Sequence, residues 1–466
     1  MVVKFGGAAL ADPHAVVARV RDLRARHGSL VVVVSAREGV TNRLLTGLSA
    51  GRDERAVERT ISWIRRQHPG IGGMGERQAA ELGRALRGRE RPSAERTDRL
   101  LAMGERWAAE WLVQTLQRGG VASTAIDAAE LGLWTDGRYG AATIDLLRSR
   151  TRVRRELRRR LARGTVPVVT GFFGRGRRGE PVTLGRGGSD YSASAVAALL
   201  KAPFVELVKR DASILSADPT IVAAARPVPR LTYAEAEELA EFGARVLHPM
   251  TVEPARQAKV EIRVRSLRRP RELTVIGGVG TGAWGVRALT ASPVVRLVRL
   301  RFPGGRRQPG ILAELCGRLA DVGVPVLQAF TSAAVISLVV GSDRVGTALA
   351  VLEPTVAGRG GRLEAPVPVV LIAAVGAGSI RQIGRFPPSI LASARGVSAT
   401  RVSVTLAVPA AGWRSSLRAL HRALLEPPSR LRRGLRGGRR PFGPESGRPP
   451  RPPRTGGHRS GGRIQS

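Results

Sequence analysis

The sequence predicts an α/β fold: a three-layer sandwich with a mainly parallel sheet, followed by two small ferredoxin-like modules. Two observations support this fold class. As far as about residue 275, short apolar segments alternate with helical patterns, which is typical of a parallel sheet covered by helices. After about residue 285 the order becomes strand, helix, strand, strand, and it recurs once, as expected for paired β-α-β-β units.

The strands of the first part are predicted from short apolar runs bounded by glycine or polar residues. These runs are residues 1–5, 29–36, 166–174, 204–209 and 260–266. Helical patterns lie between them, such as residues 12–27, where Asp12 can cap the first turn, and residues 191–200. Ligands of such sheets bind at the carboxyl ends of the strands, so functional side chains are expected there.

Residues from about 52 to 118 break this alternation. They are helical in pattern, rich in Arg and Glu, and carry no strong strand signal. We therefore predict a helical insertion over one end of the sheet, inside a first domain that spans residues 1–275.

Two smaller modules are predicted after this domain, over residues 286–365 and 366–425. Their strand patterns are residues 294–302, 325–330, 334–340, 367–376 and 398–408. Their helical patterns are residues 310–323, 387–396 and 413–425. Residues 426–466 are rich in Pro, Gly and Arg with almost no apolar residues, which predicts a disordered basic tail.

The charge of the chain is strongly unbalanced, at +39 over 466 residues, and nearly all of the excess is arginine. The simplest interpretation is that arginine has replaced lysine over the surface; a polyanion partner is the alternative. Aromatic residues make up only 4% of the chain, whereas RNA-binding surfaces interleave them with basic residues. We therefore do not expect nucleic acid as a partner.

Cys316 is the only cysteine, which excludes a disulfide within the chain and a Cys/His metal cluster. The sequence begins MVVKFGG, without a signal-peptide pattern, and no apolar run approaches the about 18–20 residues of a membrane span. These features predict a cytoplasmic protein without a membrane-spanning segment.

The first candidate site is the end of the first predicted strand, where Lys4 is followed by Gly6 and Gly7. Glycines let the backbone approach a phosphate, and an ammonium can neutralise a phosphoryl group in transfer. A purely structural turn would also explain the two glycines. Lysine is rare in this arginine-rich chain, however, and a compact ammonium is not interchangeable with a planar guanidinium, which favours a functional Lys4.

Small polar residues follow the second predicted strand, where they could hold a phosphate or carboxylate or simply begin a helix. They are Ser35, Gly39, Thr41 and Asn42. A carboxylate for a substrate ammonium is suggested by Glu105. Glu105 belongs to the tetrapeptide Met-Gly-Glu-Arg, and a second copy of this tetrapeptide earlier in the chain contains Glu76. Local sequence does not choose between the two glutamates, and a surface ion pair would explain either.

The most specific local signal is residues 183–193, a glycine-rich loop that leads into an alanine-rich helix. Gly187 and Gly188 before a helix can form an anion cradle from backbone N–H groups and the helix dipole. Arg186 suits a bidentate contact with a carboxylate, and Asp190 can orient Lys4 or a metal ion. A plain glycine-rich loop is the alternative.

Taken in order, these motifs resemble those of the aspartokinases, within the amino acid kinase superfamily. The motifs are KFGG, SAREGVTN, GERWAAEWL, TDGRYG, GFFG, TLGRGGSDYSA, SADP and EFGARVLHP. The resemblance extends over residues 1–425, and GRGGSD followed by FGARVLHP is its most specific part. It implies an amino acid kinase fold, with C-terminal modules similar to paired ACT regulatory domains, and it is strongest for the single-function, lysine-sensitive type.

By position, the resemblance implies that Lys4 and Asp190 are the catalytic residues, with Lys4 stabilising the transferred phosphoryl group. The implied aspartate-binding residues are Thr41, Glu105, Arg186 and Ser189, because the helix after Glu105 and the TDGRYG motif fit the family pattern. The implied nucleotide-binding residues are Gly6, Gly7, Gly187, Gly188, Lys209, Asp211, Ser216 and Asp218. The implied effector residues are Thr331 and Ser332, and no metal-ligating residue of the chain is implied.

The implied reaction is the ATP-dependent phosphorylation of the side-chain carboxylate of L-aspartate to 4-phospho-L-aspartate, the first step toward lysine, threonine and methionine. ATP and Mg²⁺ are the implied cofactors. Paired ACT modules imply a homodimer or larger oligomer and feedback regulation by an amino acid such as lysine or threonine.

Two segments depart from the family pattern. Ala8 and Ala9 stand where hydroxyl residues are usual. In the nucleotide segment, Arg210 occupies the usual Asp position, with Asp211 one residue later and Ser213 in place of a glycine. These departures leave open a weakly active or inactive aspartokinase-like amino-acid sensor, and, as a third class, a polyanion-binding protein driven by the tail.

Overall fold

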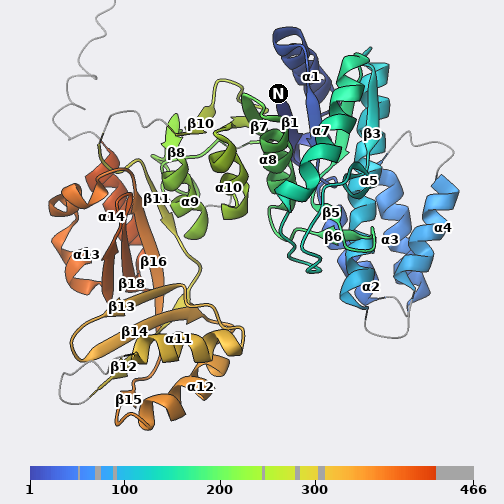
Figure 1. The fold of residues 1–466 in the computed structure, drawn as a ribbon. Coiled ribbons are helices and arrows are strands. Elements are labelled where there is room, and N and C mark those ends of the chain that lie inside the picture. The colour runs from blue at the N-terminus through green and yellow to red at the C-terminus, as the bar shows by residue number, and fades with distance from the viewer. Residues whose placement is uncertain are drawn as a thin grey trace, which may run out of the picture. The chain divides into compact units, whose positions relative to one another are not determined.

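The computed structural model describes residues 1–50, 53–68, 75–87, 92–211, 213–243, 247–278, 284–302 and 310–426. Residues 1–425 form one unit of the chain (Figure 1). The predicted basic tail, residues 426–466, lies outside the described residues except for Glu426.

The first sheet confirms the predicted parallel α/β architecture. Within the described residues it has eight strands in the order β3-β4-β2-β1-β7-β9-β10-β8, and every neighbouring pair except β9 with β10 is parallel. The strands are β1 (Val2–Phe5), β2 (Val31–Val34), β3 (Ser123–Ile126), β4 (Val166–Thr170), β7 (Phe204–Lys209), β8 (Arg230–Thr232), β9 (Glu261–Ser266) and β10 (Leu273–Gly277). Strands β1 and β2 are valine-rich because they are buried along their whole length.

Helices cover both faces of this sheet (Figure 1). One face packs against α1 (Pro13–His27), whose first turn is capped by Asp12 as predicted, and against α5 (Ala94–Arg118). The opposite face packs against a second group of helices. These are α6 (Ala128–Leu131), α7 (Leu146–Ala162), α8 (Gly188–Leu200), α9 (Tyr233–Glu241) and α10 (Pro249–Ala258). A short hairpin, β5 (Phe173–Arg175) with β6 (Pro181–Thr183), leads toward the start of α8.

The helical insertion predicted over residues 52–118 corresponds to α3 (Glu54–Gln67), α4 (Gly75–Leu86) and α5. Together with α2 (Val40–Ser49), these helices share a core of their own around Leu44, Ile64 and Leu82. The insertion lies between β2 and β3 in the chain. Its helix α5 packs on the face of the first sheet that α1 also covers.

The second sheet is antiparallel and joins the two C-terminal modules. Among the described residues its path is β13-β14-β12-β16-β18-β17, with β11 beside β16 and β15 beside β12. The strands are β11 (Ala288–Ala291), β12 (Val295–Arg301), β13 (Gln328–Thr331), β14 (Val335–Gly341), β15 (Arg362–Leu363), β16 (Val367–Val375), β17 (Gly396–Ala399) and β18 (Ser403–Pro409). The helices are α11 (Ile311–Asp321), α12 (Val345–Ala357), α13 (Pro388–Ser393) and α14 (Trp413–Leu425). The described residues also include the 3₁₀ helices η1 (Ala9–Ala11) and η3 (Ser379–Arg385).

Strand β11 corrects the predicted boundary between modules 286–365 and 366–425. It lies in the first of these ranges, yet its residues pair with β16 in the second, from Ala288 opposite Val375 to Ala291 opposite Ile372. Leu289 also packs in the core that contains α14. The first module is therefore inserted after the first strand of the second module, an arrangement that local sequence patterns cannot reveal.

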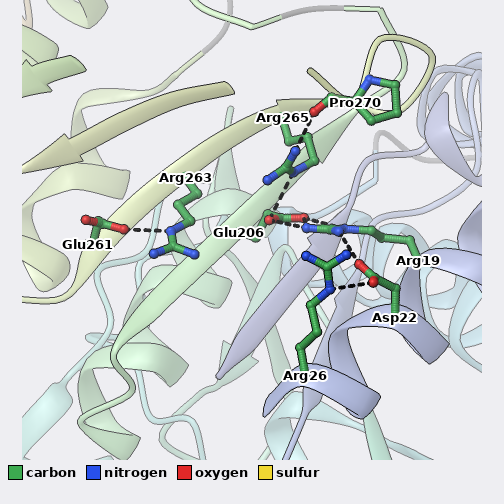
Figure 2. A network of polar contacts seen from close by, with 8 residues as sticks. All are labelled: Arg19, Asp22, Arg26, Glu206, Glu261, Arg263, Arg265 and Pro270. Atoms are coloured by element: carbon green, nitrogen blue, oxygen red, sulfur yellow. Dashed lines mark hydrogen bonds and ion pairs between the residues drawn. The ribbon is translucent and has the colours of Figure 1, made fainter. Parts of the chain in front are cut away.

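A buried ion-pair network ties the strand β7 to its neighbours (Figure 2). Glu206 in β7 is fully buried, and its Oε1 and Oε2 accept hydrogen bonds from Arg19 of α1 at 2.6–2.8 Å. Arg265 of β9 donates to the same carboxylate at 3.2 Å. Arg19 also pairs with Asp22, which in turn pairs with Arg26 (Figure 2). The network fixes β7 between α1 and β9, and β7 ends at Lys209.

Candidate active site

Two lysines and one aspartate meet at the carboxyl edge of the first sheet. Strands β1 and β7 are parallel neighbours with Lys4 opposite Leu207, so Lys4 and Lys209 lie at the same edge. Asp190 stands in the first turn of α8, which begins above this edge. Lys4 Nζ lies 2.7 Å from Asp190 Oδ1, and Lys209 Nζ lies 2.5 Å from Asp190 Oδ2. Each carboxylate oxygen therefore holds one ammonium group.

In the cluster of Lys4, Asp190 and Lys209, which carries one excess positive charge, Lys4 and Asp190 are buried and Lys209 is partly exposed. Lys4 is 4% exposed and Asp190 is 5% exposed. Burial alone would raise the pKa of Asp190, but Lys209 and Lys4 outweigh it and hold that pKa well below its ordinary value. Burial lowers the pKa of Lys4, as does the neighbouring Lys209, whereas Asp190 raises it. Such a cluster attracts a further anion.

Glycines bring the backbone close to this cluster. Gly187, with φ of +71°, precedes α8, and a Cβ on Gly188 would lie 3.0 Å from Leu184 Cβ. Gly7 passes so close to the loop after β2 that an added Cβ would lie 2.3 Å from the carbonyl oxygen of Ala36. A Cβ on Gly6 would lie 3.7 Å from Lys4 Nζ. Gly6 thus brings backbone close to Lys4, and Gly187 and Gly188 bring it to the start of α8, just before Asp190.

The structure distinguishes Glu105 from Glu76. Glu105 in α5 is 2% exposed, and its Oε1 accepts a hydrogen bond from Ala36 N at 3.0 Å. Its Oε2 has no hydrogen-bond partner in the described part of the chain. Burial raises the pKa of Glu105 to about 8, against the opposing effects of the Ala36 amide and Lys4. Glu76 is exposed on α4, so only Glu105 offers a buried, unsatisfied oxygen.

The other predicted aspartate-binding residues differ in their surroundings. Arg186 is exposed in the turn before α8 and makes no hydrogen bond or ion pair with the residues that the structure describes. Ser189 is buried in the first turn of α8, where a Cβ on Gly171 would lie 2.8 Å from Ser189 Cβ. Thr41 lies half-buried in the first turn of α2. Ser189 immediately precedes Asp190 in α8, Arg186 lies in the turn before α8, and Thr41 lies in α2, which follows the loop that contains Ala36.

The altered nucleotide segment forms an exposed arginine–carboxylate network. Asp211 accepts hydrogen bonds from Arg210 at 2.8 Å and Arg268 at 3.2 Å, and Arg210 also reaches Glu38 at 2.9 Å. Glu38 belongs to the loop after β2, next to Ala36. The Arg210 side chain therefore bridges the loops that follow β2 and β7, and the Asp211 carboxylate faces arginines.

Ser216 and Asp218, predicted to bind nucleotide, have other partners. Ser216 is 1% exposed, its Oγ lies 2.9 Å from His421 Nε2 in α14, and it accepts a hydrogen bond from Arg226 N at 3.0 Å. These contacts connect the segment after β7 to α14. Asp218 is exposed and caps the next turn by accepting hydrogen bonds from Thr220.

The two alanines that replace hydroxyl residues have different environments. Ala9 is completely buried in the core with Phe5 and Leu10, whereas Ala8 is half-buried in the turn after Gly7. Only Ala8 therefore lies where a hydroxyl would reach solvent or a ligand without displacing apolar packing.

The predicted effector residues lie at the end of the edge strand β13. Thr331 and Ser332 are exposed, and Ser332 N donates to the carbonyl oxygen of Val335 at 2.9 Å in the turn to β14. Strand β13 pairs only with β14 within the described sheet, and its Phe330 lies against β17, where a Cβ on Gly396 would lie 2.6 Å from the Phe330 ring.

Sequence reasoning missed two residues that shape the site. Asp98 in α5 is buried, and it accepts hydrogen bonds from the N–H and hydroxyl of Thr183 and from Gly140 N at 2.7–3.0 Å, which fixes the start of the glycine-rich loop. A lone aspartate on an apolar helix face was the available signal. Phe172 has a φ of +71°, a strained conformation for a bulky residue, and packs against Gly188.

The described residues contain no group of three or more His, Cys, Asp or Glu side chains that could hold a metal ion, and none of their helices is long and apolar enough to cross a membrane. The carboxylate nearest the lysines, Asp190, has both oxygens engaged by ammonium groups. The chain therefore offers no ready-made metal cage in this part of its structure.

Comparisons with known proteins agree with this geometry. The model of the amino acid kinase family matches residues 1–266. The aspartokinase of Thermus thermophilus is 29% identical over 440 residues, covering 91% of this chain and 98% of that protein. Lysine-sensitive aspartokinase 3 of Escherichia coli is 30% identical over 373 residues, covering 75% of this chain and 80% of that protein.

The solved structures extend the likeness to the whole unit. E. coli aspartokinase III in complex with aspartate and ADP, in its R-state, has a TM-score of 0.77 at 26% identity and covers 91% of this chain and 99% of that one. The same enzyme with lysine and aspartate, in its T-state, has a TM-score of 0.69. This chain belongs to the amino acid kinase family and, within it, to the aspartokinases.

Proposed function

We propose that this protein transfers the γ-phosphoryl group of ATP to the side-chain carboxylate of L-aspartate and forms 4-phospho-L-aspartate. The observation that supports this most directly is the cluster of Lys4, Asp190 and Lys209 beside the unsatisfied carboxylate of Glu105. One part of the site attracts anionic phosphate, and the other suits a cationic amino group. The product is the first intermediate on the route to lysine, threonine and methionine, which we place in the cytoplasm.

The amino acid would be held by its charged α-groups. Glu105 Oε2 is the acceptor for the α-ammonium, and the exposed Arg186 is the donor for the α-carboxylate, as a bidentate pair. Thr41 and Ser189 supply hydroxyl groups between them. With both α-groups engaged, the side-chain carboxylate is directed toward the two lysines, and this positioning accounts for much of the rate enhancement in phosphoryl transfer.

The transfer itself needs no protein nucleophile and no proton movement. An oxygen of the substrate carboxylate attacks the γ-phosphorus, the bond from that phosphorus to the β–γ bridging oxygen breaks, and ADP leaves. Lys4 and Lys209 stabilise the negative charge on the transferring group, and Asp190 holds both ammonium groups in place. The backbone at Gly6, Gly7, Gly187 and Gly188 lets phosphate oxygens approach.

Magnesium is proposed to enter with the nucleotide, since Mg²⁺ is commonly held by substrate phosphates and water. The residues present do not form a cage for it, and no step is assigned to it. Lys209, Asp211 and Asp218 are the remaining proposed nucleotide contacts.

The C-terminal modules are proposed to bind an amino-acid effector near Thr331 and Ser332 and to pair with a second copy of the chain. The exposed position of Thr331 and Ser332 at the end of β13 supports this proposal. Lysine is the first effector to test, because aspartokinase III of E. coli has been solved with lysine. The alternative of an inactive amino-acid sensor is not supported by the comparisons, and the lysine–aspartate cluster is complete in this chain.

The proposal is tested with purified full-length protein. ATP and L-aspartate are supplied with hydroxylamine, which traps an acyl phosphate as the hydroxamate, and ADP release is followed in parallel. We expect equal amounts of hydroxamate and ADP, dependent on aspartate and absent in Lys4→Met. ADP release without hydroxamate, or aspartate binding without turnover, would contradict the proposal. Added lysine and threonine test the regulation.

A further inference from the structure

The imidazole of His248 packs directly on the turn that begins α8. A Cβ on Gly187 would lie 2.4 Å from His248 Cβ, 2.8 Å from Cγ and 3.3 Å from Cδ2. Gly187 also has a φ of +71°. The glycine is therefore needed both for its backbone conformation and for the close approach of the His248 side chain, whose Cβ, Cγ and Cδ2 would be the atoms nearest to an added Cβ.

The tautomer of His248 follows from its hydrogen bond. The residue caps α10, and its Nδ1 accepts a hydrogen bond from Met250 N at 3.4 Å. When Nδ1 is an acceptor, the proton of the neutral ring is on Nε2. Burial lowers the pKa of His248, although Glu241 and Asp190 raise it. The ring is thus prepared as a neutral donor at Nε2.

The Nε2–H group has no hydrogen-bond partner among the residues that the structure describes. Asp190 raises the pKa of the ring, and the ring packs on Gly187, which lies three residues before Asp190 in the chain. Helix α10 is held firmly against α8, because Val252 and Ala255 share a core with Ala193 and Val196. His248 therefore presents a fixed donor beside the glycine turn.

We propose that His248 is a further nucleotide-binding residue, whose Nε2–H donates a hydrogen bond to a phosphate oxygen held at Gly187 and Gly188. This inference rests on the proposed function. A neutral donor suits this place, because the neighbouring cluster already supplies an excess positive charge and a third cation would lower the pKa of Lys4 further. A purely structural His248, which caps α10 and fills the space against Gly187, is the competing explanation.

Two substitutions separate the two ring nitrogens. Asparagine places its polar atoms near the position of Nδ1 and is a good N-cap, so His248→Asn keeps the cap and loses the donor at Nε2. Glutamine reaches to the position of Nε2, so His248→Gln keeps a donor there and loses the cap. The full-length variants are compared by calorimetric titration with ADP, by thermal unfolding and by steady-state kinetics.

For His248→Asn we expect a Tm close to that of the wild type, ADP binding weakened about tenfold or more, and a raised KM for ATP with the KM for aspartate within twofold. For His248→Gln we expect a lower Tm and ADP binding within about threefold of the wild type. The matched control is Thr232→Ala, which removes the capping box of the neighbouring helix α9. It should lower Tm and leave ADP binding unchanged.

Wild-type ADP affinity in His248→Asn would overturn the inference, and so would a loss of ADP binding in Thr232→Ala as large as in His248→Asn. In both cases the proposed function stands, because the wild type still binds ADP and forms the acyl phosphate. If the wild type did neither, the proposed function would fall, and the role of His248 with it.

Discussion

The Ser216 hydroxyl lies 2.9 Å from Nε2 of His421, and both side chains are buried. Ser216 belongs to the segment that follows β7 and Lys209, whereas His421 belongs to α14 of the C-terminal modules. Arg226, in the same segment as Ser216, also donates to the carbonyl oxygen of Leu425 at 2.6 Å. A displacement of α14 would therefore act on the segment that follows Lys209, so these hydrogen bonds connect the C-terminal modules to the chain that leaves the site.

Replacing Ser216 with Ala tests whether this residue is structural. The change leaves Arg226 N without its buried acceptor, which costs about 1–3 kcal/mol of unfolding free energy. We expect a lower urea midpoint, with the KM for ATP within about threefold of the wild type. Asp218→Ala, which removes only an exposed cap of the next turn, should lower the midpoint by less. A normal midpoint combined with a large rise in the KM for ATP would instead support the nucleotide role predicted from the sequence.

Replacing Lys4 with Arg should abolish most of the activity although the charge is kept. The ammonium is enclosed between Asp190 and the backbone at Gly6, and a planar guanidinium does not fit a site shaped for a point charge. We expect kcat to fall by about a hundredfold or more in Lys4→Arg and in Lys4→Met alike. Lys201→Arg, on an exposed lysine, is the control. Activity in Lys4→Arg above a tenth of the wild type would contradict this account.

Candidate site residues could be predicted where a local pattern, such as a strand end or a helix start, indicated their position. Lys4 and Asp190 were identified because a strand end and a helix start each carry a local signal, and parallel strands bring such ends to one edge. The direct contact of Lys209 with Asp190 was not foreseen, because it depends on β7 lying next to β1. The sequence does not display strand order.

The features that the sequence does not reveal share this cause. The hydrogen-bond partner of Ser216, His421, lies 205 residues later in the chain. The module boundary was misplaced because β11 pairs with a strand on the far side of an inserted module. Asp98 accepts hydrogen bonds from Thr183, which lies 85 residues later in the chain. Tertiary hydrogen bonds between distant segments decide all three cases, and periodicity and composition do not encode them.

Replacing Arg186 with Ala should affect substrate binding and not stability. The side chain is exposed and has no partner within the described structure, so its removal should change the unfolding free energy by less than about 0.5 kcal/mol. If Arg186 binds the α-carboxylate in bidentate fashion, the KM for aspartate should rise about tenfold to a hundredfold. Arg186→Lys should recover only part of this loss. An unchanged KM for aspartate in Arg186→Ala would exclude this role.

The network around Glu206 predicts a large loss of stability from a small chemical change. Glu206→Gln leaves Arg19 and Arg265 without their shared carboxylate in a buried setting, and breaking such a buried pair costs about 3–5 kcal/mol. Arg26→Gln, at the exposed end of the same network (Figure 2), should cost less than about 1 kcal/mol. Urea unfolding of the two variants measures the difference. Equal effects would show that the buried charges are not what holds β7 in place.

The raised pKa of Glu105 makes both stability and substrate binding depend on pH. Its pKa rises from an ordinary 4.5 to about 8 in the folded protein through burial. Between pH 4.5 and about pH 8, Glu105 therefore keeps its proton in the folded state and has lost it in the unfolded state. Unfolding free energy should then fall as pH rises through this window, by up to about 1.4 kcal/mol per pH unit, and level off above pH 8.

Glu105→Gln removes this dependence, so its stability relative to the wild type should increase from pH 5 to pH 8, as measured by urea unfolding at a series of pH values. The exposed Glu76→Gln should show no such trend. An α-ammonium needs the ionised carboxylate, so the KM of the wild type for aspartate should fall as pH rises toward 8, while Glu105→Gln binds aspartate weakly at every pH. A wild-type KM for aspartate that is constant from pH 6 to pH 8 would mean that Glu105 is not the ammonium site.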